Sequence, residues 1–320
     1  MTLPSYEQLK TRTDAPAGSS WGLLGDLGTV GRLGRDQTLR GLSCVRDGRV
    51  FSLDWPINAF DPPVSPSRRR ASHHIFQRHE NHRDDYLDSF FPQATSQVDG
   101  LRHQRYRGAG FYNFAPDQAI EAGGGPIGIE QWADHGIVGR GVLIDVERHL
   151  HETRGTGLDQ AGGEAFGPEV LDAALARQGV GVEEGDIVLI RTGWSEFYFS
   201  ALTPAQRGEL PRHIVSPGLR QGDDALEWLW DSSAALIAAD NAAVEAVPAI
   251  PESPYFAIED AGMMHPAMIA LLGCALGELW RLDDLAQACA ADERYDMLVC
   301  VKPLCLPGGV GSPANALAVR

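Results

Sequence analysis

The chain has 320 residues, of which 43% are hydrophobic, and this allows one large domain or two ordinary ones with a substantial core. Its formal net charge of -16 and its pI near 5.0 argue against general affinity for nucleic acid or an anionic membrane, because those partners attract an excess of Lys and Arg. No uninterrupted apolar run approaches the roughly 18 residues needed to cross a bilayer. Composition therefore favours small-molecule chemistry.

The first 20 residues are polar and include Pro4, Pro16 and Gly18. We expect an extended N-terminal arm over residues 1–20 and a single domain over residues 21–320. The arm lacks the basic and apolar pattern of a signal peptide. The chain has five cysteines, an odd number, without Cys-x-x-Cys spacing, so we expect free thiols and a cytoplasmic location.

Short apolar runs bounded by turn residues predict strands over residues 49–54, 141–146, 186–191 and 234–240. Amphipathic segments between them predict helices over residues 128–136, 167–178 and 221–232. Because strands and helices alternate, we expect an α/β domain with a central mixed, partly barrel-like sheet.

Basic residues gather between the predicted strands, where Arg68, Arg69, Arg70, Arg78 and Arg83 lie among four histidines. We interpret this stretch as an exposed loop and helix face rather than an anion site. A metal site is disfavoured there, because no cysteine and no His-x-x-x-His pattern accompanies His79 and His82. The stretch could still border the entrance of an active site.

Residues 93–103 carry the densest set of polar groups around a turn. Asp99 followed by Gly100 is a turn signal, and such a turn can bring Gln93, Gln97, Asp99 and His103 to one point. A polar surface turn in which Asp99 caps a neighbouring backbone explains the same residues. The residue types alone leave both interpretations open.

The spacing Gln93-x-x-Ser96-Gln97-x-Asp99-x-x-x-His103 resembles the His-x-Gly-Thr-His-x-Asp-x-Pro-x-His motif of the cyclase family, which includes bacterial kynurenine formamidase and isatin hydrolase. Asp99 and His103 match in identity, whereas both metal-binding histidines of the motif are glutamines here. Residues 96–103 also resemble the Ser/Thr-Gln-x-Asp-Gly-Leu-x-His form of longer members. The likeness continues in family order through residues 110–113, 128–133, 140–145, 185–194 and 265–278.

The resemblance implies a swivelling β/β/α fold without a separate second domain, a homo-oligomer, and metal binding by His265 and Glu278. In one straight helix these two residues would lie about 20 Å apart along the axis. A helix over residues 266–272 that ends at Gly273, followed by a returning strand over residues 274–280, makes their proximity possible. Alternatively, His265 is a polar helix-start residue and Glu278 a surface acid. Asp240 and Glu245 are weaker candidates, more typical of capping or loop acids.

We predict that Asp99, His265 and Glu278 hold one divalent ion, either zinc or manganese. Gln93 and Gln97 are further candidate ligands, but weak ones, because an amide oxygen is neutral, and they could instead orient water or substrate. His103 is the predicted catalytic residue, which carries a proton from water to the leaving nitrogen. The candidates for the wall of the substrate pocket are Phe111, Tyr112 and Trp194, although core packing explains any one of them.

The predicted function is a metal-dependent hydrolase that cleaves a carbon–nitrogen bond of a small cyclic imide, lactam or N-acyl arylamine. One alternative is a polyketide-type cyclase or dehydratase that uses the same site. Another is a metal-free binding protein, which the replacement of two motif histidines makes plausible.

Overall fold

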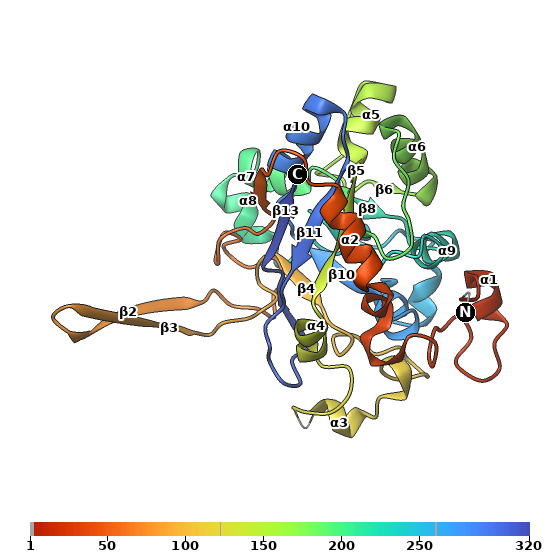
Figure 1. Cartoon of the computed structure of the whole chain (residues 1–320), viewed down its shortest axis with the longest axis horizontal. Coiled ribbons are helices and arrows are strands. Elements are labelled where there is room, and N and C mark those ends of the chain that lie inside the picture. Colours follow the sequence, from red (N-terminus) through yellow and green to blue (C-terminus); the bar gives the residue numbers. More distant parts are fainter. Residues whose placement is uncertain (1–2, 122, 260) are drawn as a thin grey trace.

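The computed structural model describes residues 3–121, 123–259 and 261–320, and its main element is a nine-stranded mixed sheet that curls into part of a barrel (Figure 1). Four central strands run parallel, and the strands on both sides of them pair antiparallel. This arrangement confirms the predicted α/β fold with a mixed, partly barrel-like sheet of the swivelling β/β/α type. In spatial order the strands are β1 (Val50–Ser52), β13 (Ala316–Val319), β11 (Asp296–Val301), β5 (Ile137–Asp145), β7 (Ile187–Arg191), β9 (Leu236–Ala239), β10 (Ala275–Glu278), β4 (Gln97–Asp99) and β12 (Gly311–Pro313).

The parallel strands form where the sequence has continuous apolar runs, because both faces of such strands are buried. All five residues of β7 are buried, and so are all four residues of β9. The predicted strands are present with shifted ends. β5 begins at Ile137, ahead of the predicted start at residue 141, because its first residues pair with β11, where Ile137 lies opposite Val301.

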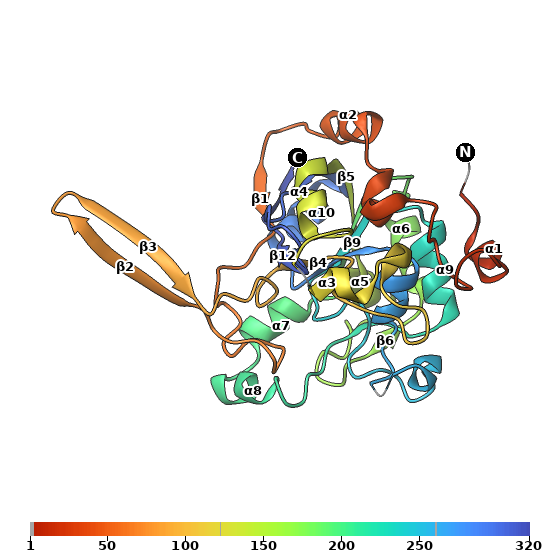
Figure 2. The ribbon, with the colours of Figure 1, turned by 90° about the horizontal axis from the view of Figure 1, so that it is seen from below.

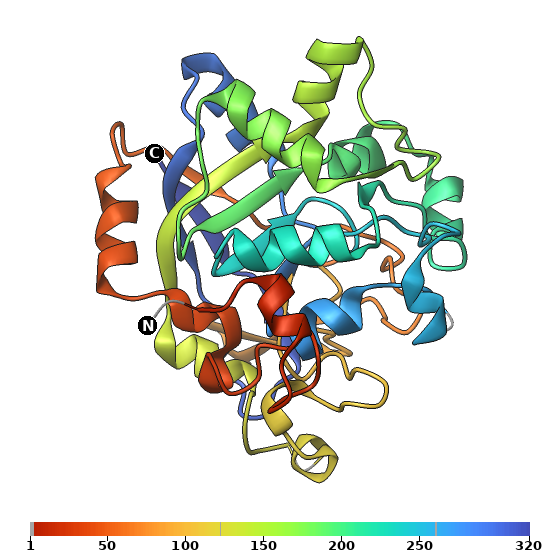
Figure 3. The same cartoon turned by 90° about the vertical axis from the view of Figure 1, so that its right-hand side faces the viewer.

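The three predicted helices are present as α4 (Ile129–His135), α6 (Pro168–Gln178) and α9 (Asp223–Asp231). With α5 (Val146–Arg154), helices α6 and α9 cover the parallel strands (Figure 3). Helix α2 (Arg35–Ser43) packs against β5 and β11 (Figure 2). The remaining short elements are α3 (Asp117–Glu121), α7 (Trp194–Ser200), α8 (Pro204–Glu209), α10 (Asp283–Asp292), the 3-10 segments Gly25–Arg32, Tyr112–Phe114 and Pro254–Ala257, and the strand pair β6 (Ala165–Phe166) and β8 (Gly218–Leu219).

The N-terminal segment is not the extended arm that its composition predicts. Tyr6–Lys10 form helix α1, which a capping box at Ser5 begins, and this helix packs against α9. Tyr6 and Leu9, three residues apart, share one helical face and are buried in the main core. The prediction is thus corrected for this part of the segment, while residues 1–2 lie outside the described residues.

The basic stretch near residue 70 is exposed as predicted, but it forms a β-hairpin rather than a loop and helix face. Strands β2 (Ser72–His79) and β3 (His82–Asp88) project from the body of the molecule (Figures 1 and 2), and every residue in both strands is exposed. Aromatic residues and isoleucine favour this conformation, and cross-strand pairs such as His74 with Tyr86 stack at 4.7 Å between ring centroids.

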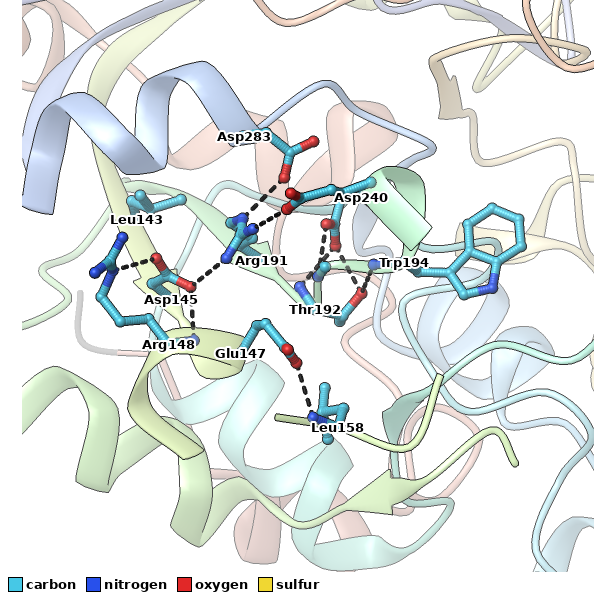
Figure 4. A network of polar contacts seen from close by, with 12 residues as sticks. Leu143, Asp145, Glu147, Arg148, Leu158, Arg191, Thr192, Trp194, Asp240 and Asp283 are labelled. Carbon is cyan, nitrogen blue, oxygen red and sulfur yellow. Dashed lines mark hydrogen bonds and ion pairs between the residues drawn. The ribbon is translucent and has the colours of Figure 1, made fainter. Parts of the chain in front are cut away.

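A buried polar network closes the carboxyl ends of β5, β7 and β9 (Figure 4). Arg191 donates to Asp145 and to Asp283, each at 3.0 Å. Asp240 accepts hydrogen bonds from the backbone N–H groups of Thr192 and Gly193. Asp240 is therefore a structural acid, and the end of the parallel strands where α/β proteins often bind ligands is filled here by ion pairs.

In the part of the chain that the structure describes, no helix is both long and apolar enough to span a membrane. All five cysteines are free thiols, and three of them are buried.

Candidate metal centre

Strand pairing places three of the predicted site residues on one face of the sheet. Gln97 and Asp99 are two apart on β4, so their side chains point to the same face. Gln97 lies opposite Glu278 of β10, and residues opposite each other in an antiparallel pair share a face. On its other side β4 pairs with β12, where Gly311 lies opposite Asp99.

His265 reaches the same point from the segment before β10. Residues Ala267–Leu271 form a π-helical turn rather than the α-helix predicted over residues 266–272, and the helical segment ends at Gly273, whose φ is 69°. The chain then returns as β10, which is shorter than the predicted strand over residues 274–280. The predicted reversal at Gly273 therefore exists, and it brings His265 to Glu278.

Asp99, His265 and Glu278 form a buried cluster whose geometry fits a divalent ion. Nε2 of His265 lies 3.0 Å from Oε1 of Glu278 and 3.4 Å from Oδ2 of Asp99. One potential ligand atom from each residue lies within 4.8 Å of the others. Tetrahedral ligands about 2.0–2.1 Å from a zinc ion would be about 3.3 Å from one another. The two separations measured from Nε2 of His265 are close to this spacing. The donor set of one nitrogen and two carboxylates suits zinc or manganese.

Glu245 fixes the orientation of the His265 ring. Its carboxylate is fully buried and lies 3.1 Å from Nδ1 of His265, and it also accepts hydrogen bonds of 2.8 Å from the Met264 backbone and from Gln221. Because a carboxylate can only accept, Nδ1 carries the hydrogen of this bond. Nε2 is then the ring nitrogen that faces Asp99 and Glu278, as metal-binding histidines require.

Gln93 and Gln97 direct their amide nitrogens toward the carboxylates of the cluster. Gln97 donates to Glu278, and its oxygen accepts a 3.2 Å hydrogen bond from Arg68. Because a guanidinium can only donate, this contact fixes the orientation of the Gln97 amide. Gln93 likewise donates to Asp99. In this arrangement the Gln97 oxygen faces Arg68 and both amide nitrogens face the acids.

His103 lies at the edge of the cluster and lines the adjacent cavity. Its Nδ1 is 3.2 Å from the amide nitrogen of Gln93, which has a second hydrogen to donate, and its Nε2 is 3.7 Å from Oδ2 of Asp99. The neutral ring therefore accepts at Nδ1 and carries its hydrogen on Nε2. About a fifth of the His103 side chain is exposed to solvent, whereas Asp99 is almost fully buried. His103 is therefore the more accessible of the two.

Burial and mutual charge set the protonation of the cluster. Burial opposes ionisation of Asp99, but the charge of His103 and a hydrogen bond with His265 outweigh it, so the pKa of Asp99 is held well below its usual value. Burial and the charge of Asp99 raise the pKa of Glu278. Burial acts against protonation of His265, yet its hydrogen bonds with Asp99, Glu245 and Glu278 raise its pKa well above the ordinary value. A cation would compete with a proton for the Nε2 atom that these acids surround.

Burial lowers the pKa of His103, although the charge of Asp99 acts in the opposite direction. His103 therefore favours the neutral form more than a solvent-exposed histidine does.

A cavity of about 220 Å³ opens onto the cluster. Its polar lining includes Arg68, Asp99, His103, His265 and Glu278, and its apolar lining includes Val64, Ile214, Ala242, Ala243, Met263 and Leu279. A hollow of about 500 Å³ beside α5 and α6 is larger but contains none of these residues. The grouping of ligands, and not size, therefore identifies the smaller cavity as the candidate site.

The three aromatic residues predicted for the pocket wall are not among the described residues that line this cavity. Tyr112 is fully buried, with its hydroxyl 3.4 Å from Ser20, and its ring packs against Gly273. Trp194 is fully buried in a separate aromatic cluster and donates to the backbone oxygen of Val215 at 2.9 Å. Phe111 packs against the main core. Tyr112 and Trp194 fill the interior of the fold, Phe111 is partly buried, and none of the three lines the cavity, so the structure does not support their prediction as substrate-binding residues.

Two residues of the site were missed or underrated by sequence reasoning. Arg68 carried no signal beyond its place in a basic stretch. Glu245 was judged a weak candidate because nothing in its local sequence indicates that residues 245 and 265 meet.

Comparison with known proteins adds the family context. The sequence profile of the Cyclase family matches residues 54–246. A crystal structure described as a novel cyclase is 31% identical, has a TM-score of 0.80, and is matched over 94% of this chain and 99% of that chain. Isatin hydrolase A from Labrenzia aggregata, bound to benzyl benzoate, is 17% identical with a TM-score of 0.55, over 88% of this chain and 97% of that chain. Isatin hydrolase A from Ralstonia solanacearum is 18% identical with a TM-score of 0.51, over 85% of this chain and 92% of that one. A search among curated proteins gave no match.

Proposed function

We propose that this chain, which belongs to the cyclase family, is a metal-dependent hydrolase that cleaves a carbon–nitrogen bond of a small cyclic imide, lactam or N-acyl arylamine. The family and the isatin hydrolase neighbours support a hydrolase or cyclase type of enzyme. One of these neighbours is bound to a product analogue, thioisatinate. The finer assignment depends mainly on the buried Asp99, His265 and Glu278 cluster at the base of a cavity.

The proposed ligands are Asp99, His265 and Glu278, which would hold one zinc or manganese ion. Such an ion polarises a carbonyl group and makes a nearby water more acidic. We assign Gln93 and Gln97 a different role from the ligand role that the sequence predicts. As hydrogen-bond donors, their amides hold the two carboxylates in place, which leaves the ion with three protein ligands.

His103 is the proposed proton carrier. Cleavage of an amide requires a proton at the leaving nitrogen, and the hydrogen on Nε2 of His103 is held beside the cluster by the Gln93 contact at Nδ1. The lowered pKa of His103 favours the neutral ring, whose free lone pair is on Nδ1. To carry a proton, the ring takes up the proton from water at Nδ1 in place of the Gln93 contact and releases the one on Nε2 to the leaving nitrogen. Its position at the cavity wall allows contact with a substrate.

Three further expectations remain part of this proposal: a homo-oligomer, a cytoplasmic location and a small-molecule substrate. The free thiols of all five cysteines agree with a reducing compartment. The cavity, at about 220 Å³, suits a small substrate.

The test is a metal analysis followed by a substrate screen. Protein purified without chelator should contain about one zinc or manganese ion per chain, and Asp99→Asn should lower that content without unfolding the protein. With the ion supplied, cyclic imides, lactams and formyl anilides should be screened for release of acid. If all three classes fail while the ion is bound, hydrolysis is excluded for these substrates and the cyclase or dehydratase alternative takes its place.

A further inference from the structure

Arg68 brings a positive charge to the wall of the cavity without a carboxylate partner. It is half-buried, and it forms no ion pair with any residue that the structure describes. By contrast, Arg70, two positions along, pairs with Asp61, and Arg191 pairs with Asp145. The guanidinium of Arg68 is close to the site, because it lines the same cavity as Asp99 and Glu278 and donates to Gln97, which in turn donates to Glu278.

The contacts of Arg68 fix one edge of its guanidinium and leave the other free. Nη1 donates to the backbone oxygen of Gln93 and to the side-chain oxygen of Gln97, and both of these acceptors are neutral. A guanidinium has five N–H donors in a planar fork. Among the described residues, none accepts a hydrogen bond from Nε or Nη2 of Arg68. Neither atom is among the buried polar atoms that lack a partner, so both donors remain available to solvent or a ligand.

The backbone around Arg68 supports a fixed position. Its N–H donates to the oxygen of Ser65 at 3.2 Å, which closes a turn, and the hydroxyls of Ser65 and Ser67 are 2.9 Å apart. Pro62, Pro63 and Pro66 restrict the preceding backbone. An arginine anchored in this way loses less conformational freedom on binding than a mobile surface arginine does.

The surroundings of the free edge decide which ligand it fits. The cavity that Arg68 lines has apolar walls at Val64, Ile214 and Met263, so a ligand bound beside the guanidinium displaces water from it. The cavity also has a carboxylate at Glu259, and this group accepts a hydrogen bond from the Met263 backbone. Removing water from an unpaired charge is costly unless the ligand supplies an opposite charge. A carboxylate fits the planar fork through two parallel hydrogen bonds.

We infer that Arg68 is a specificity-determining residue of this site, and that the substrates are small amides or imides that also carry a carboxylate. This inference rests on the proposed function, since it assigns the charge of the substrate and leaves the reacting bond to the cluster of Asp99, His265 and Glu278. The carboxylate binds Arg68, while the amide carbonyl lies toward the cluster.

The experiment compares two probes of nearly equal size. Succinamate carries one amide and one carboxylate, whereas succinamide carries a neutral amide in place of the carboxylate. Calorimetric titration of the protein, loaded with zinc or manganese, measures the affinity for each probe. We expect the wild-type protein to bind succinamate about 10- to 100-fold more tightly, the range typical of hydrogen bonds to charged groups.

Variants assign this preference to Arg68. Arg68→Met should remove most of the preference for succinamate. Arg69→Met is the matched control, because Arg69 is an exposed neighbour that does not line the cavity, and it should keep the preference. Arg68→Lys keeps the charge without the planar fork and should give an intermediate value. Arg68→Lys provides the test if Arg68→Met fails to fold.

Several outcomes would overturn the inference: a wild-type protein without a preference for succinamate, an unchanged preference in Arg68→Met, or an equal loss in Arg69→Met. Loss of the ion from Arg68→Met would also overturn it, since Arg68 would then support the metal centre and not the ligand. Failure of the proposed hydrolase function is a separate result. It would show as absent turnover in a protein that still binds succinamate through Arg68.

Discussion

The replacement Glu245→Gln tests whether His265 binds an ion through Nε2. The carboxylate of Glu245 accepts at both oxygens: Oε1 lies 3.1 Å from Nδ1 of His265, and Oε2 accepts from the Met264 backbone and from Gln221. A glutamine has one oxygen for these donors. If that oxygen serves the two donors at the Oε2 position, the amide N–H₂ faces Nδ1 of His265, and the ring must carry its hydrogen on Nε2, where the ion would bind.

The magnitude follows from the general effect of residues that orient a metal ligand. Loss of such a partner typically lowers metal affinity 10- to 100-fold, or about 1.4–2.7 kcal/mol. The variant also loses stability, by about 1–3 kcal/mol, because a buried donor is left without an acceptor. We therefore expect Glu245→Gln to fold, to unfold at a lower temperature, and to bind zinc or manganese at least tenfold more weakly.

Asp240→Asn is the matched control for this prediction. Asp240 is also fully buried and also accepts three hydrogen bonds, of 2.7, 2.7 and 2.8 Å, but its partners are Thr192 and Gly193, which do not contact the cluster. Its replacement should lower stability to a similar extent and leave metal affinity unchanged. Metal titration of chelator-treated protein, with thermal unfolding of each variant, measures both effects. Wild-type affinity in Glu245→Gln, or an equal loss in Asp240→Asn, would refute the assigned role of Glu245.

Three further predictions concern the proton carrier, the space beside the cluster and the dependence of stability on pH. His103→Ala should keep its ion but lose about 10²- to 10⁴-fold in turnover, and loss of the ion instead would identify His103 as a ligand. In Gly311→Ala the new Cβ would lie 2.6 Å from Cδ of Gln93, so that side chain must shift, which disturbs its hydrogen bond to Asp99. Metal affinity should fall as far as in Gln93→Ala, and the double variant should show no additional loss; additive losses would contradict the shared cause. Burial raises the pKa of Asp240 from 3.8 to about 7, so the folded protein binds a proton that the unfolded chain lacks between these values. The contribution of this carboxyl to stability should therefore decrease as pH rises through that range, and urea unfolding of Asp240→Asn should show a flatter dependence there.

The elements that follow from local pattern were predictable. Apolar runs fixed the positions of β7 and β9, and Gly273 marked the reversal that brings His265 to Glu278. The hairpin β2–β3 was missed because charged and histidine residues obscure its alternation, although Ile75, Phe76 and Tyr86 favour strands.

The site was predictable only in part, because its remaining members meet through tertiary contacts. Asp99, His103, His265 and Glu278 follow from motif spacing and family order. Glu245 is 20 residues from His265 along the chain, and its contact with the ring depends on the path between them. Trp194 and Tyr112 were proposed for the pocket from their residue type alone. Both are fully buried in the structure, because the interior offers large aromatic side chains more apolar contact.

Strand β4 lies between β10 and β12, and its backbone position is independent of the side chains that it contributes to the site. Main-chain pairing on both sides places residues 97–99, so the path of this strand does not depend on which side chains it carries. An imidazole can therefore be exchanged for an amide at position 97 while the backbone of Asp99 and Glu278 keeps its place. Such a strand allows evolution, or a protein engineer, to change the number of coordinating groups one residue at a time without having to rebuild the fold.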